Sequence, residues 1–211
     1  MRRNLELLEA LRFLVGGPVA LVTTRWRDQT DVMSAIWVAP VSRIPPLIAV
    51  AVHPSRHTSD MIRFAEEFAI NIPGRELLNH CQYFGVVSGR DLNKMELSRL
   101  NTFKANKVEA PLIEGCLAYI ECGLEDALRL GDHTLFIGRV AAVQAEREAF
   151  DEGWTLDDDW KPLHYLGQDR YSFLGDPVRA QLRTDDEGTV HLEEGGEGED
   201  RRDGSKEGDE G

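Results

Sequence analysis

Residues 18–52 read PVALVTTRWRDQTDVMSAIWVAPVSRIPPLIAVAV. Three segments of this stretch are rich in Val, Ile, Leu, Thr and Trp, which are residue types that favour strands. The pattern predicts strands over 18–25, 32–40 and 47–53, with a hairpin tip at Asp28–Gln29. Strands joined by such short connections pair antiparallel, so this part of the chain indicates a mainly β domain.

The chain beyond residue 52 adds helices and further strands. The predicted elements are a helix from Thr58 or Ser59 to about 67, a strand over 68–73, a helix over 75–84, a long excursion over 85–114, and strands over 116–125 and 135–147 joined by a turn at 130–133. The strands do not alternate regularly with helices, which disfavours a doubly wound parallel sheet. The pattern favours an antiparallel barrel or sandwich with helical insertions.

Charge divides the 211 residues into a body and a tail. The formal net charge is −13. Residues 185–211 carry 12 acidic and three basic residues, and they hold seven glycines with almost no apolar residue. Such a segment cannot offset its own ordering entropy, so we expect one domain over 1–184 and a disordered acidic tail over 185–211. The acidic balance also disfavours a nucleic-acid or anionic membrane partner.

The N-terminus and the cysteines predict a cytoplasmic location. Leucines at 5, 8 and 11 have helical spacing, and Glu6 and Glu9 interrupt the apolar run that a signal peptide needs. No apolar run approaches the roughly 18 residues of a membrane-spanning helix. The three cysteines are odd in number and form no CxxC pair, which is typical of small core residues in a reducing compartment.

Common catalytic and metal signatures are absent from the sequence. It contains no GxGxxG, GxxxxGK[ST], GxSxG or HExxH motif. His53 and His57 have metal-like spacing only within a helix, and Pro54 between them disfavours one. We therefore expect no metal site.

Two segments combine small or polar residues with a ring or a charge. The strand around Trp37 is lined with small side chains that would let a flat ring approach its backbone; the alternative is an ordinary barrel strand with an inward Trp. Residues 53–58, HPSRHT, join hydroxyls, a guanidinium and a helix start. Free amides and the helix dipole at such a start favour a phosphate; the alternative is plain capping by Thr58 beside a solvated Arg56.

Two further segments are ambiguous when taken alone. Residues 87–94, VSGRDLNK, offer a glycine for close backbone approach, a hydroxyl and a lysine, or else form a polar surface loop. Residues 131–138, GDHTLFIG, place an Asp–His pair at the mouth of a strand. The pair could orient a histidine for proton or hydride chemistry, or it could be a hairpin turn.

Together these segments resemble the flavin reductase-like, FMN-binding split-barrel family. The match spans about residues 15–175 and includes HPSRHTSDMI, FAINIP, VSGRDLNKME, APLIEGCLAYIEC, GDHTLFIGRV and the closing LHYLGQDRYSFLG, in the order in which the family has them. The resemblance implies a six-stranded antiparallel Greek-key split barrel with short helical insertions. It also implies a homodimer with FMN in a groove at or near the dimer interface.

The resemblance also assigns roles to residues. FMN would be held by Ser34, Ala35, Ile36 and Trp37 along the isoalloxazine ring, by Ser55, Arg56, His57 and Thr58 at the phosphate and ribityl chain, and by Ser88, Gly89, Asp91 and Lys94 over the ribityl-phosphate end. Asp132 and His133 match the family's Gly-Asp-His turn on the nicotinamide side, which makes them the catalytic candidates. Tyr165 would pack near the flavin or across the dimer.

The implied function is an oxidoreductase that transfers a hydride from NAD(P)H to N5 of FMN, with an acceptor protein, an oxygenase or free flavin receiving the electrons. Two alternatives remain. One is a flavoredoxin-like electron carrier that binds FMN and turns over NAD(P)H poorly. The other is a barrel that binds no flavin and serves as a binding module.

Overall fold

The computed structural model describes residues 6–14, 16–178, 182–184 and 186–192. They divide into two units, over 1–175 and 176–211. Within the second unit, β12 (Leu182–Thr184) pairs antiparallel with β13 (Val190–Leu192). Most of the predicted tail lies outside the described residues, and the domain boundary at 184 stays a prediction.

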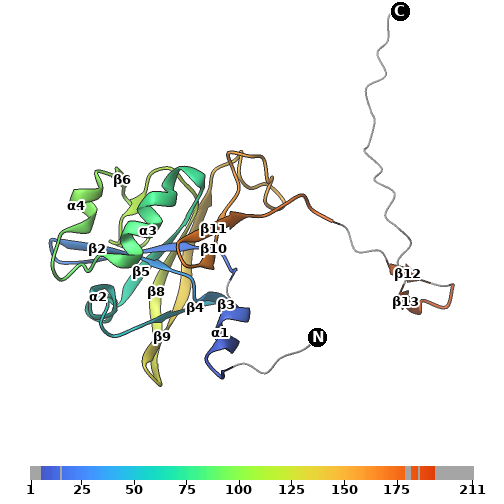
Figure 1. Ribbon diagram of the computed structural model, residues 1–211, viewed down its shortest axis with the longest axis horizontal. Coiled ribbons are helices and arrows are strands. Elements are labelled where there is room, and N and C mark those ends of the chain that lie inside the picture. The colour runs from blue at the N-terminus through green and yellow to red at the C-terminus, as the bar shows by residue number, and fades with distance from the viewer. Residues whose placement is uncertain (1–5, 15, 179–181, 185, 193–211) are drawn as a thin grey trace, which may run out of the picture. The chain divides into compact units, whose positions relative to one another are not determined.

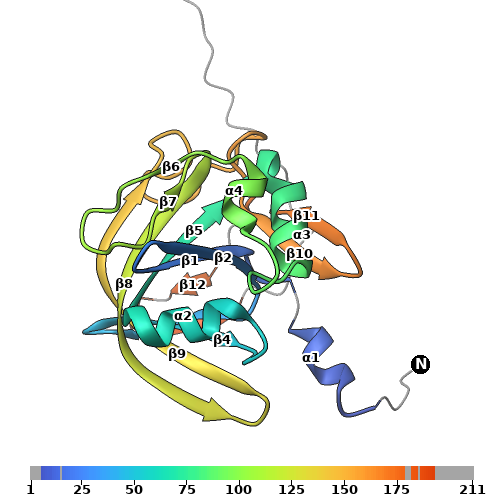
Figure 2. The same cartoon turned by 90° about the vertical axis from the view of Figure 1, so that its left-hand side faces the viewer.

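A seven-stranded antiparallel sheet forms the body of the first unit (Figure 1). Its strands are β1 (Ala20–Trp26), β2 (Gln29–Ala35), β3 (Val38–Arg43), β4 (Pro46–Val52), β5 (Glu67–Pro73), β8 (Cys116–Leu130) and β9 (His133–Ala145). They lie in the order β2-β1-β5-β8-β9-β4-β3. The sheet curls into a barrel, as Figure 2 shows, so the mainly β, antiparallel barrel class is confirmed.

The predicted count of six strands was too low, because the expected return strand over 32–40 is two strands. β2 ends at Ala35 and β3 begins at Val38. These two strands are the opposite ends of the sheet order, so the chain crosses the split of the barrel through Ile36 and Trp37. The hairpin tip is also one residue earlier than predicted, because Trp26 pairs with Gln29 across Arg27 and Asp28.

Two apolar clusters lie on opposite faces of β1. Ala20 and Val22 belong to the barrel interior, together with Phe68 and Phe136, whereas Val19 and Leu21 pack in a second cluster outside it. A strand that is buried on both faces needs no polar alternation, which explains the continuous apolar run at its start. The two clusters give the sheet a fixed position relative to the helices that cover it.

Short helices close one end and one side of the barrel. They are α2 (His57–Ala65), the 3₁₀ turn η1 (Arg75–Leu77), α3 (Leu78–Val86) and α4 (Lys94–Ser98), whereas α1 (Glu9–Phe13) has no buried residue. Helix α2 lies across one end of the barrel and inserts Ile62 into the interior cluster (Figure 2). None of the helices in the described ranges is long and apolar enough to cross a membrane.

The remaining strands form two small hairpins, β6 (Thr102–Phe103) with β7 (Leu112–Ile113), and β10 (Leu163–Gly167) with β11 (Arg170–Phe173). The second hairpin is fixed to α3 because the Tyr171 hydroxyl donates to Gln82 Oε1 at 2.7 Å. Tyr165 packs edge-to-face on Tyr171, with ring centroids 5.2 Å apart. All three cysteines are buried and free, as the sequence predicted.

Candidate functional site

The segment from His53 to Thr58 turns sharply into α2. The Ser55 N–H donates to His53 Nδ1 at 3.1 Å, and Ser55 Oγ lies 2.8 Å from the same nitrogen. Arg56 is the N-cap residue in an extended conformation, and no side chain caps the helix there. The first amides of a helix have no intrahelical acceptor and form the positive end of its dipole. This start of α2 therefore suits an anion.

The loop from Ser88 to Asn93 lies against the start of α2. Arg90 forms an ion pair with Asp60 at 2.5 Å and also donates to the carbonyl oxygens of Ser55 and Pro54. Ser88 Oγ accepts from the Arg90 N–H at 3.2 Å. Asp91 is exposed. These contacts bring the two predicted phosphate segments together, although they are distant in sequence.

A buried carboxylate joins both segments to the first hairpin. Asp31 Oδ2 accepts from Thr58 Oγ1 at 2.5 Å, and Asp31 Oδ1 lies 3.2 Å from Lys94 Nζ. We call Asp31, Thr58 and Lys94 the Asp31 cluster. The Asp31 and Lys94 side chains are each only 3% exposed. Gly89 packs so closely on the Asp31 carboxylate that a Cβ at this position would collide with it.

From the sequence we assign no role to Asp31, which follows closely after the predicted hairpin tip at Asp28–Gln29. The one signal in its favour is a charged residue directly before the apolar run of β2. Lys94 and Thr58 were predicted to contact FMN, and the structure shows that each already has a partner in Asp31. They can support the segments on which the other predicted residues lie.

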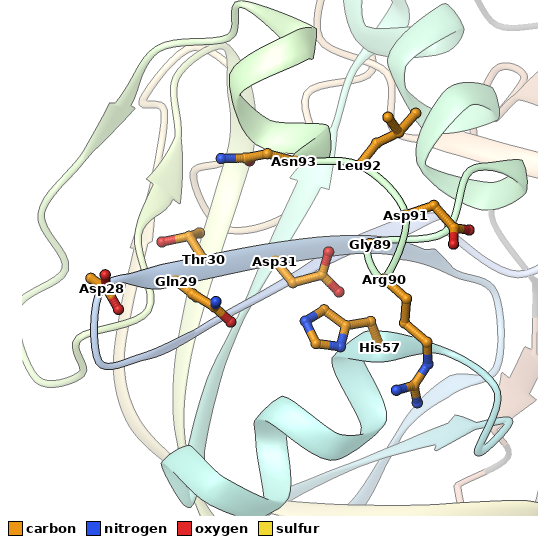
Figure 3. Close-up of a pocket in the computed structure, with 10 residues that line it drawn as sticks. All are labelled: Asp28, Gln29, Thr30, Asp31, His57, Gly89, Arg90, Asp91, Leu92 and Asn93. Atoms are coloured by element: carbon orange, nitrogen blue, oxygen red, sulfur yellow. The ribbon is translucent and has the colours of Figure 1, made fainter.

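A cavity of about 560 Å³ opens between the first hairpin, the start of α2 and the loop over 89–93 (Figure 3). The Asp31 carboxylate lies between the Gly89 loop and the imidazole of His57. The Nδ1 atom of His57 is buried and has no hydrogen-bond partner within the described part of the chain. A buried polar atom without a partner is costly unless a ligand or a water completes its bonding.

A second group of side chains lies at the tip of the β8–β9 hairpin. The rings of Trp37 and His133 are 4.7 Å apart between centroids, and those of His53 and His133 are 5.2 Å apart. His133 Nδ1 lies 2.7 Å from Asp132 Oδ1. We call Trp37, His53, Asp132 and His133 the histidine cluster. Trp37 is 41% exposed, so the cluster presents a flat aromatic surface to solvent.

Electrostatics fixes the orientation of the two imidazoles. The hydrogen bond from His133 holds the pKa of the Asp132 carboxyl below its usual value. A carboxylate can only accept a hydrogen bond, so His133 Nδ1 is the donor to Asp132. His53 has the opposite arrangement, because its Nδ1 accepts from the Ser55 N–H. This bond also links the histidine cluster to the start of α2.

The other three residues predicted along the isoalloxazine ring point into the protein. Ser34 Oγ donates to the Cys81 carbonyl oxygen at 2.5 Å. Ala35 is buried in the barrel interior, and Ile36 packs against the outer cluster. Only their backbone, at the crossing from β2 to β3, could face a ring beside Trp37. The described residues contain no group of three or more His, Cys, Asp or Glu side chains that could hold a metal ion.

Fold and site together define a small antiparallel split barrel with an anion-receptive helix start and an exposed ring surface beside it. A family model described as the flavin reductase like domain matches residues 12–174, and the chain belongs to this family. An uncharacterized protein of Archaeoglobus fulgidus is 38% identical over 60% of this chain and 71% of its own length.

Two other relatives and two solved structures extend the comparison. YddH of Escherichia coli K12 is 35% identical over 83% of this chain and 96% of its own. A flavin reductase of Pseudomonas putida is 32% identical over 51% and 60%. An FMN-binding protein from Thermus thermophilus has a TM-score of 0.75 at 26% identity, covering 86% of this chain and 99% of its own. A flavoredoxin from Methanosarcina acetivorans has a TM-score of 0.72 at 25% identity, covering 87% and 95%.

Proposed function

We propose that the protein is an NAD(P)H-dependent flavin reductase that works with FMN. One observation carries the proposal: the uncapped start of α2 is joined, through the bond between Ser55 and His53, to an exposed surface of aromatic rings. An anion receptor beside a flat surface suits a ligand with a phosphate at one end and a ring at the other. The likeness to a flavin reductase and to an FMN-binding protein supports the same proposal.

The residues of this chain fit FMN. The uncapped amides at the start of α2, the Arg56 guanidinium and the unpartnered Nδ1 of His57 would hold the phosphate, and Ser55 would lie beside it. The loop that carries Ser88, Gly89 and Asp91 would close over the ribityl chain. When bound, FMN would supply the acceptor for a hydride from a reduced nicotinamide.

The histidine cluster would orient the nicotinamide. Asp132 holds His133 in one tautomer and limits its rotation, and Trp37 offers a flat surface that excludes water from one side. We also propose that the protein forms the homodimer that its family resemblance implies.

The direct test is the absorption spectrum of the purified protein mixed with FMN, recorded without oxygen before and after addition of NADH and then NADPH. Rapid bleaching of the flavin bands by either nucleotide supports the reductase. Bands that persist with both nucleotides would favour a flavoredoxin-like electron carrier, which the likeness to the Methanosarcina acetivorans protein makes the second candidate. A protein that takes up no FMN would overturn both and leave a binding module.

Replacing Arg56 tests the phosphate segment. Arg56→Ala should weaken FMN binding by about 1–3 kcal/mol, the range of a hydrogen bond that involves a charged group. The dissociation constant can be measured by quenching of flavin fluorescence. Arg147→Ala, an exposed arginine outside the site, is the control. Equal affinities in Arg56→Ala and the control would remove Arg56 from the phosphate site.

A further inference from the structure

Asp31 is a buried acid that faces two cationic segments. Its carboxylate contacts Lys94 Nζ and the Thr58 hydroxyl, and its side chain is 3% exposed. Thr58 lies in the first turn of α2, two residues after Arg56. The carboxylate thus places a fixed negative charge at the helix start that would otherwise attract an anion most strongly.

Lys94 is the cation that Asp31 neutralises. Burial lowers the pKa of the Lys94 ammonium, Asp31 counteracts this effect, and the nearby Arg56 guanidinium lowers the pKa further. Lys94 and Arg56 are therefore close enough to repel each other, and Asp31 balances one of the two charges. Without Asp31, the buried charge of Lys94 would no longer be balanced at the start of α2.

The same carboxylate also faces the cavity beside His57. Asp31, His57 and Gly89 all line it, and the Gly89 backbone packs directly on the carboxylate. Lys94 balances this carboxylate in the wild type, so the pair as a whole exerts little net force on a second anion. A phosphate monoester carries a charge of about −1.5 to −2 near neutral pH, and without Asp31 it would be attracted by the unbalanced charge of Lys94.

We propose that Asp31 sets the affinity of the site for the flavin phosphate by neutralising the charge of Lys94 beside the start of α2. The inference rests on the proposed function, because it takes Ser55–Thr58 as the phosphate segment. Asp31 would then be an affinity-determining residue that does not itself touch the flavin ring.

The test compares FMN with riboflavin, which has the same ring and ribityl chain without the phosphate. Asp31→Asn keeps the shape and an acceptor for Thr58 but removes the charge. We expect FMN to bind at least about tenfold more tightly to Asp31→Asn than to the wild type, because one unit charge acting at up to about 10 Å with an effective dielectric constant of about 20 changes an affinity by at least this factor. The affinity for riboflavin should not change. Asp151→Asn, which removes an exposed acid that does not line this cavity, should leave both affinities unchanged.

The opposite result would overturn the inference. If Asp31→Asn weakens FMN and riboflavin by the same factor, Asp31 only holds the segments in place. A wild type that binds neither flavin would overturn the proposed function itself, and the inference with it. A wild type that binds FMN but shows no gain in Asp31→Asn would overturn the inference alone.

A double variant covers the case in which Asp31→Asn does not fold. Asp31→Asn with Lys94→Gln removes both buried charges, and replacing a complete buried pair is often tolerated. Because the pair has no net charge, the ratio of FMN to riboflavin affinity should stay within about twofold of the wild-type ratio. A tenfold fall in that ratio would show that Lys94 attracts the phosphate without being cancelled by Asp31, which contradicts the inference.

Discussion

The Asp31 cluster and the histidine cluster lie at opposite ends of the short segment from His53 to Thr58, and they are built in opposite ways. In the Asp31 cluster, the side chains of Asp31 and Lys94 are each 3% exposed. Together with Thr58 they join β2, α4 and α2. In the second, the Asp132 side chain is 80% exposed and bonds to its neighbour in sequence. Both clusters pair a carboxylate with a cationic or basic nitrogen. The two pairs therefore contribute differently to the stability of the fold.

The difference follows from desolvation. A buried charge is stable only while its partner is present, because neither can return to water. An exposed pair is screened by solvent and contributes little to stability. We therefore expect changes in the Asp31 cluster to alter folding and affinity, and changes in the histidine cluster to alter turnover in a fold that stays intact.

The largest effect should come from Lys94→Ala. It leaves Asp31 buried without its counter-charge, which costs about 3–5 kcal/mol in comparable pairs. Denaturant unfolding followed by circular dichroism measures the loss. Arg139→Ala breaks the exposed pair with Glu125 and should change the midpoint far less. A midpoint for Lys94→Ala close to that of Arg139→Ala would show that the Asp31 cluster is not a structural anchor.

A smaller effect is expected for Thr58→Val. The substitution keeps the shape of the side chain and removes the donor to Asp31, which leaves Lys94 as the remaining partner in the cluster. A hydrogen bond to a charged group contributes about 1.5–3 kcal/mol. The same unfolding experiment applies, with Thr30→Val on β2 as the control. Equal stability of the two variants would mean that the Thr58 bond contributes nothing.

The elements that could be predicted from the sequence are those that depend on local patterns of residues. Strands β1, β4 and β5 and helix α2 lie within about two residues of their predicted positions, because strand propensity and helix-start residues act over short range. The crossing at Ile36 and Trp37 was missed, since an apolar run looks the same whether it continues along one strand or moves to the other edge of the sheet. Only the closed order of the strands reveals it.

The Asp31 cluster escaped prediction for a related reason. Asp31, Thr58 and Lys94 come from three distant segments, and nothing in the residues around Asp31 shows that a lysine 63 positions later will be buried beside it. In the histidine cluster, the pairing of Asp132 with His133 was predicted, and the contact of His133 with His53 was not. Asp132 and His133 are neighbours in the chain and form a recognisable pair, whereas His53 joins them only through the packing of the β8–β9 tip.

His133→Ala should separate turnover from stability. Loss of the ring removes the group that we expect to orient the nicotinamide, and the rate of NAD(P)H oxidation should fall about 10- to 100-fold, as for other positioning groups. FMN affinity and the unfolding midpoint should hardly change, because His133 lies away from the start of α2. Stopped-flow bleaching and flavin fluorescence measure the two quantities. Parallel losses in both would join His133 to the flavin site.

The smallest effect is expected for Asp132→Asn at acid pH. The His133 bond holds the pKa of Asp132 below its usual value of 3.8, so this carboxylate stabilises the fold above that pH and loses its contribution as the pH falls through the lower folded-state pKa. Exposure to solvent keeps the contribution small. Unfolding midpoints of wild type and Asp132→Asn should therefore differ only slightly at about pH 6, and the difference should shrink as the pH falls below 3.8. A difference at pH 6 as large as that of Thr58→Val would mean that the exposed cluster also anchors the fold, and the contrast between the two clusters would fail.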